Sequence, residues 1–397
     1  MNGGVLGCRK PDFSLPAGLH YLNCAYMSPL PRAVEAAGVE AIARKRAPHT
    51  IGPSDFFEDA DRVRSLFATL IGAPDGANVA LVPAVSYPMS LIARSTVARA
   101  GSNIVTSAGQ FPSNVYPWRK LASRCGLEMR TVAAPDSARR GEAWNAAILA
   151  AIDGRTALVA LPQVHWTDGT LFDLPRIGEA CRSHGAAFVI DATQSIGAYP
   201  FDIERIGADA VACAGYKWLL GPYGMGVAWI GPRYSNAEPL EDTWIGRAGS
   251  DDFRGLVNYR DDYQPGAARF DVGERSSFIL LPMLRRGLEL VLEWGAERIQ
   301  DYCRDLVEDS IAEAASLGFR ADDADSRASH LFGLRAPAGI DIERLQRTLA
   351  ERGVIVSLRG SAVRVSPNLY NDGSDMVALL DVLRSAVTLE DATLSTL

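Results

Sequence analysis

The segment Cys213–Gly226 reads CAGYKWLLGPYGMG and is the most informative stretch of this chain. It begins inside the apolar run DAVACA and places Lys217 between two aromatic residues, just ahead of a glycine-rich stretch. A solvated surface lysine needs no such setting, whereas a lysine that forms a covalent bond is commonly desolvated. The glycines do not make a dinucleotide-binding fingerprint, because they lead into the strand-like VAWIG and not into a helix.

A second strand end carries matching chemistry. The stretch VIDATQS, Val189–Ser195, ends an apolar run with Asp191, and Gln194 follows three positions later. A carboxylate at the end of a buried strand is costly unless a cation partners it. Taken alone, such an aspartate is more often a turn or cap residue, and a lone loop lysine is more often a surface charge. Neighbouring parallel strands, however, would bring Asp191, Gln194 and Lys217 to one edge of a sheet.

This combination fits a planar heterocyclic aldehyde such as pyridoxal 5′-phosphate (PLP). Lys217 would form a Schiff base with the aldehyde, and Asp191 would keep the pyridine nitrogen protonated so that the ring accepts electrons. Gln194 would contact the phenolic oxygen. We therefore predict Lys217 and Asp191 as catalytic residues, and we count both, together with Gln194, among the cofactor-binding residues.

Short apolar runs alternate with helix-like stretches from about Asn78 onward. The predicted strands cover 78–82, 103–107, 128–134, 156–164, 186–192, 209–215 and 226–231, and the predicted helices cover 87–99, 113–125, 143–152 and 176–185. Such alternation predicts an α/β domain with a mostly parallel, seven-stranded sheet. Ligands of such sheets bind at the carboxyl ends of the strands.

The pattern changes near Phe278. A long helix is predicted over 281–295, and the segments VIVSLRG and AVRVSPNLYN belong to a smaller α+β region. We expect an N-terminal segment over 1–20, a large cofactor-binding domain over 21–272 and a small C-terminal domain over 273–397. Residues 232–270 show little periodicity and are predicted to form a long excursion near the site or at an interface.

Composition narrows the class of protein. The 397 residues are 48% hydrophobic and 22% charged, and the formal net charge is −7. A negative charge argues against binding to nucleic acid or to an anionic membrane surface, and no run of about 20 apolar residues predicts a transmembrane helix. The N-terminus lacks the apolar core of a signal peptide. The six cysteines lack a CxxC pair and the five histidines are dispersed, so we predict a cytoplasmic protein with reduced thiols and no metal site.

With these motifs in view, the chain resembles the class V aminotransferase family of fold-type I PLP enzymes, which includes cysteine desulfurases, kynureninases and isopenicillin N epimerase-like proteins. The DATQS and GYKW motifs are the specific part, and the likeness extends from YLNCAYMSPLP to VRVSPNLYND. The resemblance implies a small amino acid as substrate and a homodimer whose active sites lie at the subunit interface.

The resemblance also implies roles for residues outside those two motifs. PAVSYPMS matches the segment that cradles the cofactor phosphate, so Ser86 and Tyr87 would meet the phosphate at the start of a helix, where free N–H groups favour an anion. Ser86 is otherwise an N-cap. Tyr216 resembles the phenol that touches the phosphate in kynureninases. Phe111, in GQFPSNVYPW, takes the place of the ring that stacks on the cofactor, unless it is a core residue.

Substrate-binding residues follow from the same resemblance. Arg364, in AVRVSPNLYN, matches the arginine that clamps the substrate α-carboxylate through two parallel hydrogen bonds. A structural ion pair is the alternative role for Arg364, and Arg359 is the nearby alternative residue. Asn23 and Ala25, in YLNCAY, match the segment that lines the substrate entrance.

Two further segments complete the predicted site. FDVGERSSF resembles the stretch that the partner subunit adds to the phosphate site, with Ser276 or Ser277 as the donor. PQVHWTDGT resembles a strand-end motif that often carries asparagine where this chain has Trp166. We assign His165 and Trp166 to the cofactor site, and we expect His165 either to face the cofactor or to be satisfied within its loop.

Departures from the family pattern narrow the reaction. LAERGVIVSLRGSAV lacks the nucleophilic cysteine of cysteine desulfurases, and Phe111 stands where they carry a histidine that shuttles a proton. Kynureninases tend to have histidine at the position of Gln194. We predict amino-group transfer from a small amino acid, with Lys217 as general base. The alternatives are a β-lyase without a persulfide cysteine, an epimerase, and a catalytically silent PLP-fold sensor.

Overall fold

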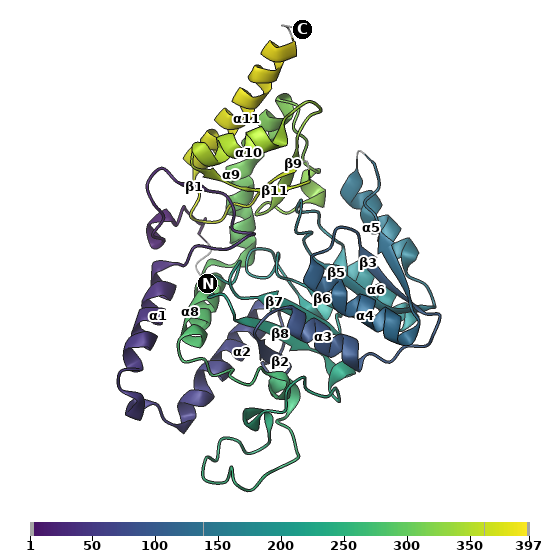
Figure 1. Ribbon diagram of the computed structural model, residues 1–397, viewed down its shortest axis with the longest axis vertical. Helices are drawn as coiled ribbons and strands as arrows, with labels where there is room; N and C mark the ends of the chain where they lie inside the picture. Colours follow the sequence, from purple (N-terminus) through teal and green to yellow (C-terminus); the bar gives the residue numbers. More distant parts are fainter. Residues whose placement is uncertain (1–3, 138, 361, 395–397) are drawn as a thin grey trace.

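The computed structural model describes residues 4–137, 139–360 and 362–394. Its central sheet has seven strands in the order β2-β8-β7-β6-β5-β3-β4 (Figure 1). Their bounds are β2 Val79–Val82, β3 Asn103–Ser107, β4 Glu128–Val132, β5 Thr156–Pro162, β6 Ala187–Asp191, β7 Ala210–Ala214 and β8 Gly226–Ile230. Strand β8 runs antiparallel to β2 and β7, and the other neighbours are parallel. The predicted α/β sheet is therefore confirmed.

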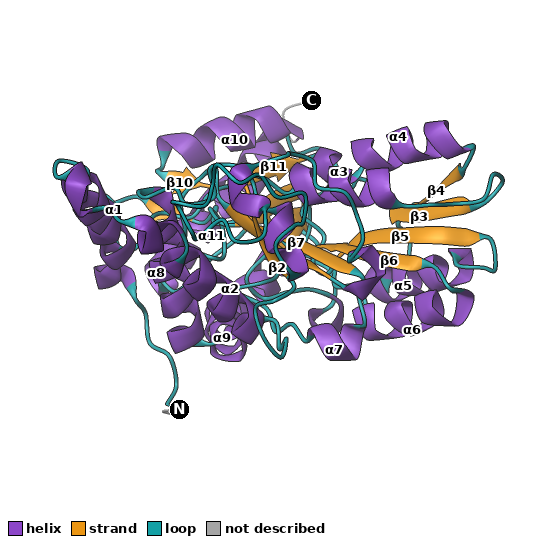
Figure 2. Cartoon of the chain, turned by 90° about the horizontal axis from the view of Figure 1, so that it is seen from below, coloured by secondary structure: helices purple, strands orange, loops and turns teal. Residues whose placement is uncertain are grey.

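Helices cover both faces of this sheet. Figure 2 shows α3 and α4 on one face and α5, α6 and α7 on the other. Their bounds are α3 Ser86–Ser95, α4 Tyr116–Cys125, α5 Arg140–Ala151, α6 Leu174–His184 and α7 Ile203–Ile206. Every residue of β6 and β7, with sequences AFVID and AVACA, is buried. Such continuous apolar strands are typical of a parallel sheet between two helical layers.

The core follows this layering. One apolar cluster contains Trp144 of α5 and Phe188 of β6, and a second contains Trp118 of α4 and Val189 of β6. Phe188 and Val189 are consecutive, and their side chains leave a strand on opposite faces. Alternate residues of β6 therefore supply the two cores, while its last residue, Asp191, is left at the sheet edge.

One predicted helix ends earlier than expected. The sequence predicts a helix over 87–99, whereas α3 begins at Ser86 and ends at Ser95. Thr96 is already extended, and its hydroxyl donates to the carbonyl of Ile92 at 2.7 Å. The β-branched pair Thr96 and Val97 loses side-chain freedom in a helix, which favours the extended backbone here.

Four longer helices flank the sheet on the side of the termini. They are α1 Arg32–Arg44, α2 Glu58–Leu70, α8 Leu280–Trp294 and α9 Ala296–Ser316. Helix α8 matches the predicted helix and packs against α1 and α2. Helix α9 was not predicted from the sequence. It is separated from α8 by Gly295, whose φ of 77° breaks the helical path.

The C-terminal region has its own sheet. Strands β11 Ser357–Arg359, β12 Ala362–Val365 and β9 Phe332–Arg335 are antiparallel in that order, and helices α10 Ile342–Glu351 and α11 Gly373–Leu394 complete the region. Strand β1, His20–Tyr21, pairs in parallel with β10, Val354–Ile355. The start of the chain is thereby joined to the region that follows α9 (Figure 1).

Residues 232–270 contain only short 3-10 helices and an isolated bridge between Arg247 and Tyr263. They form the long loop at the bottom of Figure 1. Across the described ranges, no helix is both long enough and apolar enough to cross a membrane.

Candidate active site

Asp191 and Lys217 come to one edge of the central sheet. Asp191 is the last residue of β6 and lies opposite Ala212 of the parallel strand β7. Lys217 follows the end of β7, where Gly215 donates its N–H to the carbonyl of Met225 at 2.9 Å. A Cβ atom at Gly215 would lie 2.6 Å from that carbonyl oxygen. A larger residue at this position would therefore displace the loop that carries Lys217.

A cavity of about 200 Å³ opens at this edge. Its walls come from the loops that follow β2, β3, β5, β6 and β7, which is where ligands of such sheets bind. The lining residues are Pro83, Ala84, Val85, Gln110, Phe111, Ser113, Pro162, Val164, Trp166, Asp191, Thr193, Gln194, Ala214, Tyr216, Lys217, Tyr223, Gly224 and Met225.

The amine of Lys217 is buried, with 7% of the residue exposed. Burial lowers the pKa of Lys217 to about 8, with a further contribution from the charge of Arg364 that Asp191 opposes. The Nζ atom lies 5.7 Å from the ring centroid of Phe111 and 5.5 Å from that of Tyr216. No hydrogen bond or ion pair engages Nζ within the described part of the chain. The lowered pKa gives Lys217 a larger neutral fraction near neutral pH than an exposed lysine has, which favours its use as a nucleophile or base.

The carboxylate of Asp191 is buried without a cation in contact among the described residues. The N–H of Thr193 donates to its Oδ1 at 3.1 Å. Burial raises the pKa of Asp191, although the hydrogen bonds from Thr193 and the charge of Lys217 act in the other direction. A cationic ring N–H placed against this carboxylate would offset its burial.

Gln194 lines the cavity with its side-chain amide held at both ends. Its Nε2 donates to the carbonyl of Ala25 at 3.1 Å, and its Oε1 accepts from Nε1 of Trp218 at 2.9 Å. The backbone carbonyl of Gln194 accepts from Nε2 of His330 at 2.7 Å. Ala25 is fully buried and does not line the cavity. The structure therefore places Ala25 as a support for Gln194.

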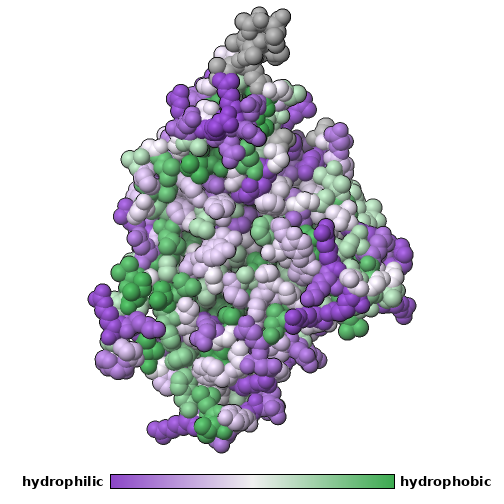
Figure 3. Space-filling model, in the orientation of Figure 1, coloured by the Kyte–Doolittle hydropathy of each residue, from purple (hydrophilic) through white to green (hydrophobic). Residues whose placement is uncertain are grey.

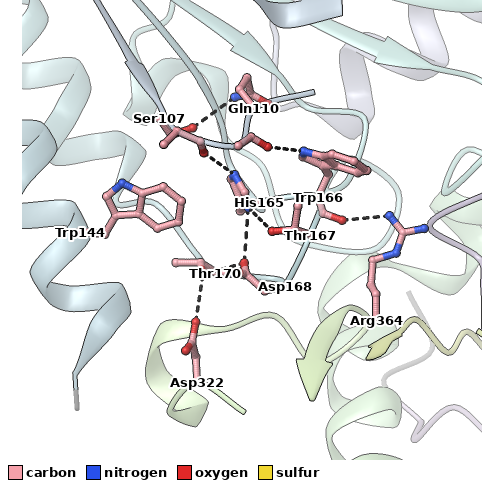
Figure 4. Close-up of polar contacts among 12 residues, drawn as sticks. Ser107, Gln110, Trp144, His165, Trp166, Thr167, Asp168, Thr170, Asp322 and Arg364 are labelled. Atoms are coloured by element: carbon pink, nitrogen blue, oxygen red, sulfur yellow. Dashed lines mark hydrogen bonds and ion pairs between the residues drawn. The ribbon is translucent and has the colours of Figure 1, made fainter. Parts of the chain in front are cut away.

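Aromatic rings enclose the cavity. Phe111 and Trp166 meet edge to face with centroids 5.5 Å apart, and the centroids of Tyr216 and Tyr223 lie 4.6 Å apart. The indole Nε1 of Trp166 donates to the carbonyl of Gly109 at 2.7 Å (Figure 4). Phe111 keeps 36% of its surface exposed, so it is not a core side chain. These rings offer a planar ligand an apolar face to stack on.

The start of α3 reaches the cavity through the residues that precede it. Pro83, Ala84 and Val85 line the cavity, whereas Ser86, the first residue of α3, is exposed beside it. The N–H of Tyr87 donates to the carbonyl of Ala84 at 3.1 Å, and the buried hydroxyl of Tyr87 has no partner among the described residues. The hydroxyl of Ser86 and the N-terminus of α3 could therefore bind an anion such as a phosphate.

Arg364 of β12 lies beside Trp166. Its Nη1 donates to the carbonyl of Trp166 at 2.9 Å, and its Nη2 donates to Ser357 Oγ at 3.2 Å and to Asn23 Oδ1 at 3.5 Å. Burial and the charge of nearby Arg359 lower the pKa of Arg364 to about 9. These acceptors are all neutral. Arg364 therefore keeps a charge that a substrate carboxylate would balance.

His165 does not line the cavity. Figure 4 shows its contacts with Thr167 and Asp168. Its ring centroid lies 4.9 Å from that of Trp144, its Nε2 donates to the carbonyl of Ala108 at 3.2 Å, and its Nδ1 lies 2.8 Å from Thr167 Oγ1. Trp166 begins a turn in which the N–H of Gly169 donates to the carbonyl of His165 at 2.9 Å, and the cavity lining includes Trp166 but not His165. We therefore leave His165 out of the proposed cofactor-binding set.

Ser276 and Ser277 lie apart from the cavity of their own chain. The hydroxyl of Ser276 donates to the carbonyl of Phe56 at 2.7 Å. The hydroxyl of Ser277 accepts from the N–H of Leu280 at 3.3 Å, at the start of α8. Neither serine lines the cavity. Their predicted contact with the phosphate therefore depends on a second subunit.

Thr193, Gln110 and Tyr223 are among the lining residues that the sequence did not single out. Thr193 stands between Asp191 and Gln194, so its place in the strand-end loop was readable from the motif. Gln110 and Tyr223 were not, because their loops carry no periodic pattern that assigns a direction to a side chain.

The side chains around the cavity fit PLP. A buried carboxylate is placed for the pyridine N–H, aromatic rings for the ring face, an amine for the aldehyde, and a helix start for the phosphate. The fold and this set of groups define a member of the fold-type I class of PLP proteins.

Comparison with known proteins places the chain within that class. The profile of the aminotransferase class-V family matches residues 44–376, and the chain belongs to this family. Isopenicillin N epimerase from Streptomyces clavuligerus is 27% identical over 379 residues, which cover 91% of this chain and 93% of the epimerase. Relatives named as aminotransferase and as kynureninase match at 27% and 26% identity. The family membership predicted from the motifs is confirmed.

Solved structures show the same fold. The apo cysteine desulfurase from Thermococcus onnurineus NA1 superposes with a TM-score of 0.83 at 21% identity, covering 96% of this chain and 99% of the desulfurase. A C-DES mutant with glycine covalently linked to its PLP cofactor superposes with a TM-score of 0.82 at 18% identity, covering 92% of this chain and 96% of C-DES. The family is one of PLP-dependent enzymes whose members catalyse different reactions.

Proposed function

We propose that this enzyme uses PLP to transfer the amino group of a small amino acid. The main support for this proposal is the burial and the lowered pKa of Lys217. Lys217 is the one basic side chain that lines the described cavity, and burial lowers its pKa to about 8. A single amine on one side of the substrate could take a proton from Cα and hold it for return on the same face, as amino transfer requires.

The other side chains would position the reactants. When bound, PLP supplies an electron sink for the electron pair left at Cα. Lys217 would hold the cofactor through its side-chain amine, and the same amine, when free, would take the proton from Cα. Arg364 binds the α-carboxylate and so orients the Cα–H bond. Asp191 would keep the pyridine nitrogen protonated, and Phe111 and Trp166 would offer the ring an apolar surface.

The cysteines do not favour a persulfide-forming desulfurase. All six are free, and none of them lines the described cavity. Burial raises the pKa of Cys24 to about 11, which keeps that thiol protonated. The absence of disulfides among these six residues supports a reducing compartment such as the cytoplasm.

Epimerisation has less support than amino transfer because it needs a proton carrier on each face of the substrate. Phe111 and Trp166, which would cover the face away from Lys217, have no titratable group. The 27% identity to isopenicillin N epimerase nevertheless makes epimerisation the second candidate.

We further infer that the enzyme is a homodimer with shared active sites. The predicted phosphate donors Ser276 and Ser277 lie away from their own cavity. Figure 3 shows apolar side chains gathered over α1, at the left of the view, and Val39 and Ile42 of this helix are 62% and 54% exposed. Exposed apolar patches mark interaction surfaces. Sedimentation analysis should give a dimer, and the double variant Val39→Glu, Ile42→Glu should give a monomer.

The reaction is tested by product analysis in a single turnover. The purified yellow enzyme is mixed with one small amino acid at a time, without an amino acceptor. Amino transfer predicts loss of the yellow absorption and about one equivalent of 2-oxo acid per site, and a 2-oxo acid acceptor should then restore the colour. Release of a β-fragment, or accumulation of the opposite enantiomer with the colour retained, would replace amino transfer by the lyase or the epimerase reaction.

A further inference from the structure

Arg359 and Arg364 lie on the same face of the small antiparallel sheet. Strands β11 and β12 place Ser357 opposite Arg364, and Arg359 opposite Ala362. Residues two apart on a strand share a face, so Arg359 is the diagonal neighbour of Arg364. Both guanidinium groups approach Trp166, with Cζ of Arg359 5.0 Å and Cζ of Arg364 6.0 Å from the ring centroid. The two cations therefore flank one indole.

No carboxylate balances these two charges within the described ranges. Arg364 donates only to neutral acceptors, and Nη1 of Arg359 donates to the carbonyl of Leu358 at 2.6 Å. The Nε atom of each arginine is buried without a hydrogen-bond partner among the described residues. Burial lowers the pKa of both groups, and the charge of Arg359 lowers that of Arg364 further. Two neighbouring guanidinium groups without a carboxylate partner favour the binding of anions.

Trp166 connects this pair of arginines with the cavity. Its indole lines the cavity that contains Lys217, while its carbonyl accepts from Arg364 (Figure 4). A substrate bound between Lys217 and Arg364 would therefore extend past Trp166 toward Arg359. The α-carboxylate can balance the charge of Arg364 and leaves that of Arg359.

We propose that Arg359 binds a second anionic group, a carboxylate or sulfinate carried by the side chain of the substrate. The substrate class is then a small acidic amino acid, and Arg359 is the residue that selects it. The inference rests on the proposed function, in which Arg364 binds the α-carboxylate.

The test measures carboxylate binding to the holoenzyme by calorimetry at constant ionic strength. Glutarate carries two carboxylates, and pentanoate has the same chain length with one. We expect glutarate to bind about tenfold more tightly than pentanoate, because a charge-assisted hydrogen bond to Arg359 is available only to glutarate. Neither compound has an amino group, so the result does not depend on whether amino transfer occurs.

Four variants test whether the preference for glutarate depends on Arg359. Arg359→Gln should remove the preference for glutarate and leave pentanoate binding unchanged, and Arg359→Lys should retain part of it. Arg364→Gln should weaken both ligands. Arg347→Gln, which removes the same charge from an exposed position of α10, should keep the preference.

Equal affinity of the wild-type enzyme for glutarate and pentanoate would overturn the inference, even if amino transfer is observed. A glutarate preference that survives in Arg359→Gln would also overturn it, because the second anion would then bind elsewhere. Conversely, a glutarate preference that depends on Arg359 would stand even if product analysis identified another reaction at the same site.

Discussion

Asp191 and Lys217 stand 26 positions apart in the sequence and share one buried cavity, where burial favours the neutral form of each. The pKa of the carboxyl is raised and that of the amine is lowered to about 8. The charge of each group favours the ionised form of the other. Here desolvation is the largest contribution to both pKa shifts. A bound ligand that pairs with the carboxyl and with the amine would therefore offset the cost of burying them.

Replacing Lys217 tests its covalent role. Lys217→Met should prevent covalent retention of PLP, because no amine remains to bond with the aldehyde. After borohydride reduction, the intact mass of the wild-type protein should increase by one cofactor and that of the variant should not. A cofactor-sized mass increase in the variant would assign the bond to another lysine.

The pH dependence of cofactor capture follows from the pKa of Lys217. The neutral amine is the nucleophile, and its folded-state pKa is lowered from 10.5 to about 8. The rate at which the apoprotein captures PLP should therefore rise with pH, with a midpoint near pH 8 in stopped-flow absorbance. A midpoint near the ordinary lysine value would show that the capturing amine is exposed.

Asp191→Asn should separate stability from activity. Burial raises the pKa of Asp191, so above its ordinary value of 3.8 the ionised carboxyl destabilises the folded apoprotein. The variant apoprotein should resist urea at pH 7 at least as well as the wild type. Its rate of 2-oxo acid formation should fall about 10–100-fold, because a charge-assisted hydrogen bond to the cofactor is lost.

Asp168→Asn is the matched control for Asp191→Asn. Asp168 is also buried, but there the hydrogen bond to His165 and the charge of Arg140 outweigh burial and lower its pKa. Its carboxylate therefore stabilises the fold at neutral pH, and the variant should be less stable to urea. Equal stability changes in the two aspartate variants would contradict the assigned signs.

His165→Ala tests the placement of His165 outside the cavity. The variant loses the hydrogen bonds to Ala108 and Thr167 and the contact with Asp168, which should reduce the free energy of unfolding by about 1–3 kcal/mol. The midpoint of the pH–rate profile for 2-oxo acid formation should stay unchanged, because the imidazole carries no proton in the reaction. A shifted midpoint would return His165 to the catalytic set.

His330 should make the fold sensitive to acid. Burial lowers its pKa from 6.5 to about 4, so between these values the unfolded state binds a proton that the folded state does not. The free energy of unfolding should fall by about 3 kcal/mol as the pH drops from 6.5 to 4. In His330→Gln the free energy of unfolding, measured with urea at each pH, should fall less between pH 6.5 and 4. In the exposed control His49→Gln its fall should equal that of the wild type.

Much of the fold could be predicted from local patterns. Buried parallel strands are short and apolar throughout, so the segments AAFVIDA and DAVACAG could be predicted as strands. The residues that follow a strand lie at its carboxyl end. Helix α9 and the pairing of β1 with β10 were missed. A polar helix gives a weak signal beside α8, and a two-residue strand becomes recognisable only when its distant partner is known.

Within the site, local sequence was sufficient to identify the residues that follow each strand, and so to name Lys217, Asp191 and Gln194. The directions of the side chains became known only from the folded chain. The tertiary structure brings Trp166, but not His165, to the cavity wall, and it sets Arg359 beside Arg364 through the register of β11 and β12. Local sequence constrains backbone conformation, whereas direction and counter-charge depend on contacts between residues that are far apart in the chain.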